Sequence, residues 1–124
     1  MKLYTIVRDY QHEIIIEKSR FICTLKKVST EEEAQDFIKE IRKKYWDATH
    51  NCSAYIVGEN TAAQRSNDDG EPSGTAGLPM LEVLRKNNLH NVAAVVTRYF
   101  GGIKLGAGGL IRAYTNSIAE AVEQ

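Results

Sequence analysis

The sequence contains few cysteines, no long apolar stretch and no recognisable targeting segment. Two cysteines in 124 residues, Cys23 and Cys52, cannot form a disulfide framework and suit a reducing compartment. No apolar run approaches the roughly 20 residues of a membrane-spanning helix, and the N-terminus lacks the apolar core of a signal peptide. We therefore expect a cytoplasmic protein that makes no membrane contact.

Neither sign of charge is in excess. The chain carries 16 basic and 16 acidic residues, so its formal net charge is zero. This balance excludes a broadly basic domain, and any nucleic-acid site must be a local patch. Only three histidines are present and none has a metal-ligand spacing, so we predict no metal site and no bound cofactor. The length fits a single domain over residues 1–124.

Apolar patterning predicts both strands and helices. Thr30 and Glu33 match a capping box, and the apolar residues from Ala34 to Tyr45 then recur at helical spacing. Two more helices are expected, one beginning near Pro79 and one running from about Gly109. Strands are expected over Leu3–Val7, His12–Glu17, Phe21–Val28, Cys52–Val57 and Val92–Val96, whereas Thr61–Ser66 is either a strand or an irregular loop.

The order of these elements indicates an α+β fold, with a mixed β-sheet and helices packed on one face. Val92–Val96 is apolar throughout, which is typical of a strand buried on both faces. Tyr99 and Phe100 follow this strand, and we expect at least one of the two rings to lie in the core.

A glycine-rich loop after this strand is the strongest candidate for a binding site. The loop contains five glycines, Gly101, Gly102, Gly106, Gly108 and Gly109. Uncovered backbone N–H groups beside a helix N-terminus favour an anion, and Arg98, Lys104 and Arg112 add three cations. The spacing matches neither a P-loop nor a dinucleotide fingerprint. The alternative is that the glycines only permit tight turns and close packing.

The turn-rich segment Ser66–Thr75 carries an acidic cluster of Asp68, Asp69 and Glu71. These carboxylates can form turns, pair with Arg98 or Lys104, or hold Mg²⁺ and through it a phosphate. His50 and Cys52 suggest a nucleophilic pair, but a binding or network role for His50 is favoured over catalysis. No catalytic residue is therefore assigned, and an enzymatic activity is not favoured.

Two long motifs resemble those of the YigZ/IMPACT family. They are RSNDDGEPSGTAGLPML at 65–81 and NVAAVVTRYFGGIKLGAGGLIRAY at 91–114. The segments DATHNCSAY at 47–55 and KSRFI at 18–22 are also similar to the family pattern, so the resemblance covers essentially the whole chain. Two departures, at Asn67 and Ala107, leave every charged position unchanged.

The resemblance implies an N-terminal domain whose fold is similar to the second domain of a small-subunit ribosomal protein and to elongation-factor G domain IV. Bacterial members usually carry a following ferredoxin-like domain, which this chain lacks, so we expect a domain of a longer protein or a short member. The resemblance also implies regulation of translation and a stress response. Some members carry a proline-dipeptidase label, but no two-metal ligand set supports that activity here.

Taken together, these observations favour a non-enzymatic binding domain that contacts RNA or a partner related to the ribosome or to a translation factor. The binding surface would comprise Arg98, Lys104, Arg112 and the loop 101–109, with His50 and the acidic cluster nearby. Two alternatives remain open: an Mg²⁺-assisted enzyme acting on a small phosphorylated compound, and a protein-interaction module in translational control.

Overall fold

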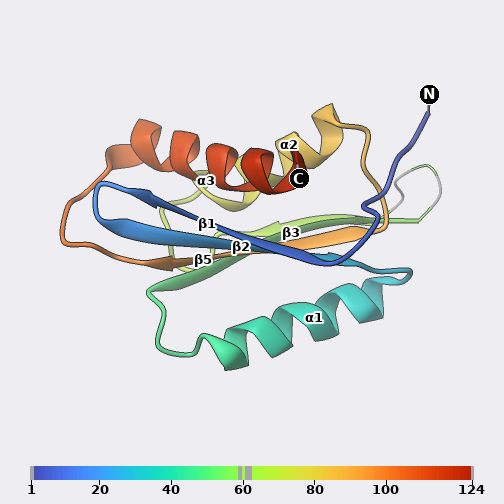
Figure 1. Ribbon diagram of the computed structural model, residues 1–124, viewed down its shortest axis with the longest axis horizontal. Helices are drawn as coiled ribbons and strands as arrows, with labels where there is room; N and C mark the ends of the chain where they lie inside the picture. The colour runs from blue at the N-terminus through green and yellow to red at the C-terminus, as the bar shows by residue number, and fades with distance from the viewer. Residues whose placement is uncertain (1, 59, 61–62, 124) are drawn as a thin grey trace.

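A five-stranded β-sheet forms the centre of the molecule (Figure 1). A computed structural model describes residues 2–58, 60 and 63–123. The strand order across the sheet is β1-β2-β5-β3-β4, and all four pairings are antiparallel. The strands are β1 (Tyr10–Ile16), β2 (Ser19–Lys27), β3 (His50–Val57), β4 (Ala63–Asn67) and β5 (Val92–Tyr99).

Helices cover both faces of this sheet. Figure 1 shows α1 on one side and α2 with α3 on the other. The predicted α+β class is confirmed, but the sheet is antiparallel rather than mixed and the helices do not share one face. The physical reason lies in β3 and β5, which are buried along nearly their whole length and therefore need cover on both faces. The helices are α1 (Glu31–Lys44), α2 (Gly77–Lys86) and α3 (Gly106–Glu123).

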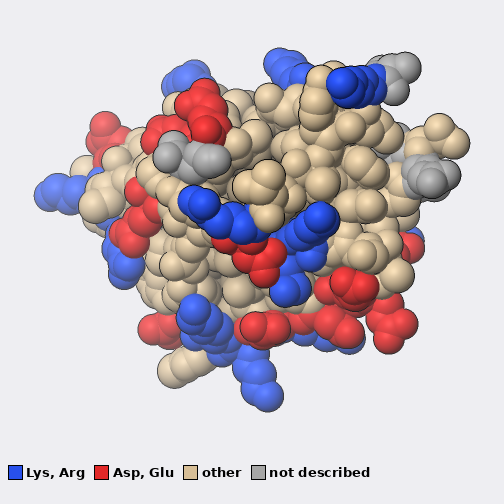
Figure 2. Space-filling model, turned by 45° about the vertical axis from the view of Figure 1, so that its right-hand side comes forward, with Lys and Arg blue, Asp and Glu red and all other residues tan. Residues whose placement is uncertain are grey.

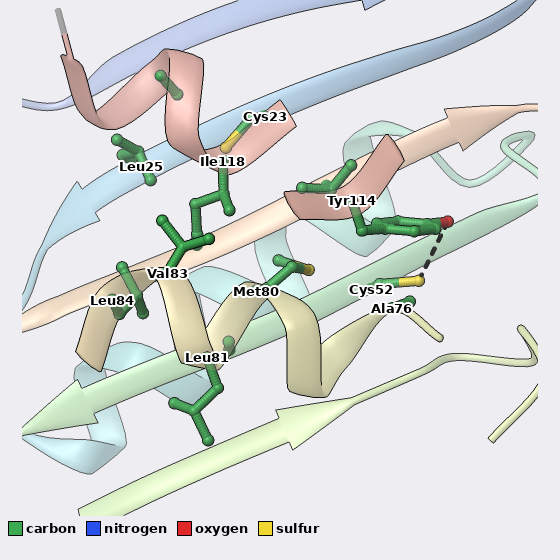
Figure 3. Packing of buried hydrophobic residues seen from close by; sticks show 14 of the residues in the cluster. Cys23, Leu25, Cys52, Ala76, Met80, Leu81, Val83, Leu84, Tyr114 and Ile118 are labelled. Atoms are coloured by element: carbon green, nitrogen blue, oxygen red, sulfur yellow. Dashed lines mark hydrogen bonds between the residues drawn. The ribbon is translucent and has the colours of Figure 1, made fainter. Parts of the chain in front are cut away.

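The central strand β5 contributes alternate side chains to two apolar cores. Val96 and Ala94 lie in the core beneath α2 and α3, whereas Val95 and Ala93 lie in the core beneath α1. Figure 3 shows part of the first core, in which side chains of α2 and α3 meet those of β2 and β3. β5 thus joins the two layers and positions whatever follows its C-terminal end.

Helix α1 begins as the sequence predicts. The Glu33 N–H donates to Thr30 Oγ1 at 3.1 Å, and Glu33 Oε2 accepts from the Ser29 N–H at 3.3 Å. Acidic residues fill its first turn and basic residues its last turn, which complements the helix dipole. Phe37 and Ile41 are buried against the sheet, so the predicted apolar stripe is the packed face.

Several predicted boundaries differ from the structure. Leu3–Val7 is not a strand, because only Tyr4 forms an isolated bridge, to Leu89. Helix α3 begins at Gly106, three residues before the predicted start. Thr61–Ser66 corresponds to β4, although residues 61 and 62 lie outside the described residues. Neither Tyr99 nor Phe100 is a core residue, and the Phe100 ring is 47% exposed.

Charge is interspersed over the visible surface, in keeping with the zero net charge. On the face that Figure 2 presents, Lys and Arg side chains alternate with Asp and Glu. In the part of the chain that the structure describes, no helix is both long and apolar enough to cross a membrane.

Candidate anion and nucleic-acid site

A pocket lies at the C-terminal end of β5, where the glycine-rich loop leads into α3. Its volume is about 430 Å³. The side chains that give it chemical character are His50, Glu71, Arg98, Phe100 and Lys104, and Gly106 lines it with the first turn of α3. We call this cavity the Arg98 pocket. It is formed by segments far apart in the sequence, which the sheet brings to one end.

Arg98 forms the floor of the Arg98 pocket and is itself buried, with an exposed fraction of 5%. Its Nη1 donates to Glu71 Oε2 at 2.9 Å, and Nε and Nη2 both reach Ser19 Oγ at 3.3 Å. The guanidinium also lies 5.5 Å from the Phe21 ring centre and 5.4 Å from that of Phe100. Arg98 is therefore a fixed charge within an ion pair, not a mobile surface cation.

Glu71 connects this ion pair to a chain of buried donors. The Tyr114 hydroxyl donates to Glu71 Oε2 at 2.5 Å, and the Cys52 thiol donates to the Tyr114 oxygen at 3.4 Å (Figure 3). Burial, together with the neighbouring Cys52 and Glu71, raises the pKa of Tyr114 far above its ordinary value. The phenol therefore keeps its proton and serves as a donor to the carboxylate.

His50 stands beside the same carboxylate but belongs to a second set of contacts. Its Nδ1 lies 2.8 Å from the Asp69 carbonyl oxygen, and its Nε2 lies 3.4 Å from Glu71 Oε1. Because a carbonyl oxygen only accepts, Nδ1 must carry a hydrogen in this geometry. Gly70, with φ of +91°, passes close to the imidazole: a Cβ there would lie 3.2 Å from Nδ1. His50 therefore contacts both the Asp69 backbone and the Glu71 carboxylate, and its role in binding stays a prediction.

Cysteine catalysis is not supported by the environment of Cys52. The side chain is fully buried, and the Asp68 carbonyl oxygen, 3.1 Å from its Sγ, is a second acceptor within reach of the single thiol hydrogen. Burial raises the pKa of Cys52 well above its ordinary value, so the thiolate required of a nucleophile is suppressed. Burial likewise raises the pKa of Cys23 to about 12.

The acidic segment organises protein structure instead of gathering around a cation. Asp68 accepts backbone N–H bonds from Gly74, Ala76 and Gly77 at 2.8 to 3.1 Å. Asp69 pairs with Arg42 at 3.1 Å and accepts the Asn51 N–H at 2.8 Å. Among the described residues, no three His, Cys, Asp or Glu side chains are arranged to hold a metal ion. The Mg²⁺-dependent alternative therefore lacks a ligand set in this segment.

Three of the five loop glycines are required by the local backbone geometry. A Cβ on Gly101 would lie 2.1 Å from the backbone carbon and oxygen of Lys18, so the β5–α3 loop and the β1–β2 turn are in direct backbone contact. Gly102 and Gly106 have φ of +89° and +74°, which strain any other residue. Gly108 and Gly109 lie in the first turn of α3.

The structure brings some of the predicted site residues together and separates others. Arg98, Lys104, Gly106, His50 and Glu71 line one pocket. The remaining predicted residues do not line this pocket. Arg112 is exposed on α3, Asp68 accepts the Gly77 N–H, and Asp69 accepts the Asn51 N–H. These other residues are Gly101, Gly102, Gly108, Gly109, Arg112, Asp68 and Asp69.

Sequence reasoning missed two residues that contact the floor of the Arg98 pocket without lining it. Ser19 lies 79 positions from Arg98 in the chain, and no spacing rule connects them. Tyr114 fits the apolar stripe of the last helix, and its position in that stripe gives no sign of a polar role, although a buried tyrosine hydroxyl usually has a partner. Another depression, of about 480 Å³ between α2 and α3, is lined mainly by apolar side chains such as Leu78, Val83 and Ile111. It lacks the charged floor of the Arg98 pocket.

Comparison with known proteins defines the class to which this fold and pocket belong. Residues 17–122 match the Impact N-terminal domain, and the chain belongs to that family. It is 66% identical over 119 residues to the IMPACT family member YvyE of Bacillus subtilis, covering 96% of this chain and 55% of that protein. The chain thus spans about half the length of that relative.

Two solved structures share the fold. One, described as the crystal structure of a hypothetical protein, superimposes with a TM-score of 0.92 at 38% identity and covers 97% of this chain and 59% of that one. The other is the two-domain translational regulator Yih1, with a TM-score of 0.62 at 26% identity, covering 98% of this chain and 48% of that one. The predicted family resemblance is therefore confirmed.

Proposed function

We propose that this chain is a non-enzymatic binding domain that acts in the cytoplasm in the regulation of translation and contacts RNA. The likeness to Yih1, which is described as a translational regulator, supports the first part. The proposed RNA contact rests on one end of the sheet, where exposed aromatic rings and cations occur together. We call this surface the loop end and define it as residues 17–20, 45–50 and 99–106.

Three loops are joined at the loop end by specific contacts. Tyr99 Oη donates to Asp47 Oδ1 at 2.9 Å, and the Phe100 N–H donates to Thr49 Oγ1 at 3.0 Å. The Gly101 N–H reaches Ser19 Oγ at 3.2 Å. Figure 1 shows the β1–β2 turn and the segments that follow α1 and β5 at the same end of the molecule. The loop end is therefore one continuous surface.

Its side chains have the character of a single-stranded RNA surface. Trp46 is 81% exposed and Phe100 is 47% exposed, so both rings are open to a partner in solution. Lys18 and Lys104 are exposed cations on the same loops, and Arg20 at the start of β2 is exposed but paired with Glu13 at 2.8 Å. Aromatic rings stack on unpaired bases and cations neutralise phosphates, a combination that recurs in single-strand binding.

The first test measures affinity for a 12-nucleotide single-stranded RNA by fluorescence anisotropy at several salt concentrations. Lys104→Ala should weaken binding several-fold and reduce the salt slope by roughly 0.7, the value expected for one phosphate contact on a single strand. Trp46→Ala should weaken binding by about 1–3 kcal/mol with little change in that slope.

Lys86→Ala is the matched control, because it removes an exposed lysine at the end of α2, opposite the loop end. The RNA proposal is wrong if Lys104→Ala and Trp46→Ala bind RNA as the unmodified protein does. Association with a translation component that survives ribonuclease and ignores both substitutions would indicate a protein partner instead.

A further inference from the structure

The dimensions of the Arg98 pocket limit what can enter it. About 430 Å³ is near the lower end of the roughly 300–1,000 Å³ range of small-molecule sites. Its floor is closed by the ion pair of Arg98 and Glu71, which are 5% and 7% exposed. A nucleic-acid strand cannot pass through a pocket that is closed by this floor. The pocket therefore suits one nucleotide-sized group rather than a continuous segment of chain.

One wall of the pocket is apolar and aromatic. It comprises Phe100 together with Pro72, Leu105 and Leu110. The Arg98 guanidinium lies 5.4 Å from the centre of the Phe100 ring, so a cation–π contact with the floor helps to fix the position of that ring. This wall can therefore pack against a planar aromatic group such as a nucleobase.

Another part of the pocket lining, next to Leu105 and Leu110, attracts an anion. It is the first turn of α3, an 18-residue helix whose first backbone N–H groups have no partner within the helix. Leu105 precedes this helix and its side chain cannot accept those N–H bonds. A Cβ built on Gly106 meets nothing within 4 Å, so open space lies beside this turn. Lys104 adds a side-chain cation next to it.

The charges of the floor do not oppose an anion. Glu71 is compensated by Arg98 at 2.9 Å and by the Tyr114 hydroxyl at 2.5 Å. What remains uncompensated in the pocket is therefore positive: Lys104 and the N-terminal end of the α3 dipole.

The geometry points to a nucleoside monophosphate as the ligand of the Arg98 pocket, with its phosphate at Lys104 and the first turn of α3 and its base against Phe100. The same group occurs free in solution and as the phosphorylated end of an RNA. The inference rests on the proposed RNA contact only where the group is the phosphorylated end of an RNA. When the ligand is the phosphorylated end of an RNA, the pocket binds the terminal nucleotide, and the rest of the loop end binds the adjoining nucleotides.

The first experiment uses free ligands. AMP, CMP, GMP and UMP at millimolar concentration should raise the melting temperature of the chain, and the matching nucleosides or inorganic phosphate alone should raise it less. Ala107→Glu places a carboxylate in the anion subsite while favouring the helix electrostatically, so it should fold and lose the shift. Phe100→Ala should reduce the shift, and Lys86→Ala should leave it unchanged.

The second experiment uses one 12-nucleotide RNA in three forms: 5′-phosphorylated, 3′-phosphorylated and without a terminal phosphate. One phosphorylated form should bind at least tenfold more tightly than the unphosphorylated form, and Ala107→Glu should remove that advantage. RNA binding that needs Lys104 and Trp46 but ignores terminal phosphates and mononucleotides would overturn the pocket assignment and leave the proposed function standing. Mononucleotide binding without RNA binding would overturn the proposed RNA contact and leave the pocket assignment standing. Absence of both kinds of binding would overturn both proposals.

Discussion

At the scale of single residues, the fold depends on a charge pair that is almost fully shielded from water. Arg98 and Glu71 are joined at 2.9 Å, and each has further donors or acceptors around it. Such a pair adds little compared with an apolar contact of the same volume, but removing one partner leaves an uncompensated buried charge. The two side chains are therefore far more sensitive to single than to joint replacement.

Glu71→Gln tests this dependence, because it removes the charge and keeps the side-chain size. We expect the free energy of unfolding to fall by about 3–5 kcal/mol, since the Arg98 guanidinium then lacks its counter-charge. Urea denaturation followed by circular dichroism measures the loss. Tyr114→Phe, which removes one hydrogen bond to the charged Glu71 carboxylate, should cost about 1.5–3 kcal/mol. A loss below 1 kcal/mol for Glu71→Gln would show that the pair is not energetically coupled.

Sequence reasoning succeeded where the signal is local and failed where it is not. The capping residues Thr30 and Glu33 and the apolar run of Val92–Val96 lie within a few positions of one another, and both predictions were confirmed. The meeting of Ser19, Glu71 and Arg98 depends on strand order, which no single segment encodes. A strand predicted to be buried on both faces does, however, require cover on both faces, and that consequence argues against the predicted one-sided packing.

At the scale of elements, the acidic turn serves as the N-terminal cap of α2. Ala76 precedes this helix and offers no side-chain acceptor. Asp68, eight residues before Ala76, supplies the missing acceptor, because its Oδ1 accepts the N–H groups of both Ala76 and Gly77. Burial alone would raise the pKa of Asp68, but bonds from Gly74, Gly77 and Ala76 outweigh it and hold the pKa below its ordinary value of 3.8.

This cap gives stability a predictable dependence on pH. Because the pKa of Asp68 is lower in the folded state, its contribution is present above the unfolded value near 3.8 and is lost as pH falls through the folded value. Asp68→Asn should lower the free energy of unfolding at pH 7 by about 1 kcal/mol, the usual contribution of a cap. Urea titrations between pH 7 and pH 2.5 should show the two stability curves converging in acid. Parallel curves across that range would mean that the charge of Asp68 does not cap the helix.

At the scale of the whole molecule, the two cores share the central strands β3 and β5. Val95 faces the layer that contains α1, and Val96 faces the layer that contains α2 and α3. Neither layer can lose β5 without exposing the other, so we expect the domain to unfold as one cooperative unit.

Val95→Ala and Val96→Ala test this cooperativity. Each should reduce the free energy of unfolding by on the order of 2 kcal/mol, through lost burial and the cavity left behind. Native-state hydrogen exchange should show slowly exchanging amides of α1 and α3 losing equal protection in both variants. Val7→Ala is the control, because that side chain is 91% exposed and its loss should change stability by less than about 0.5 kcal/mol. A loss confined to α1 in Val95→Ala would show that the layers unfold separately.

The buried floor of the Arg98 pocket has a consequence for how members of this family can diverge. The groups that hold the fold, Arg98 and Glu71, lie beneath those that would meet a ligand, Lys104 and Ala107. Exchanging the upper residues leaves the lower network and both cores untouched. Recognition can therefore change by surface substitution alone, without a new architecture, and relatives that share this scaffold can bind different ligands at the same place.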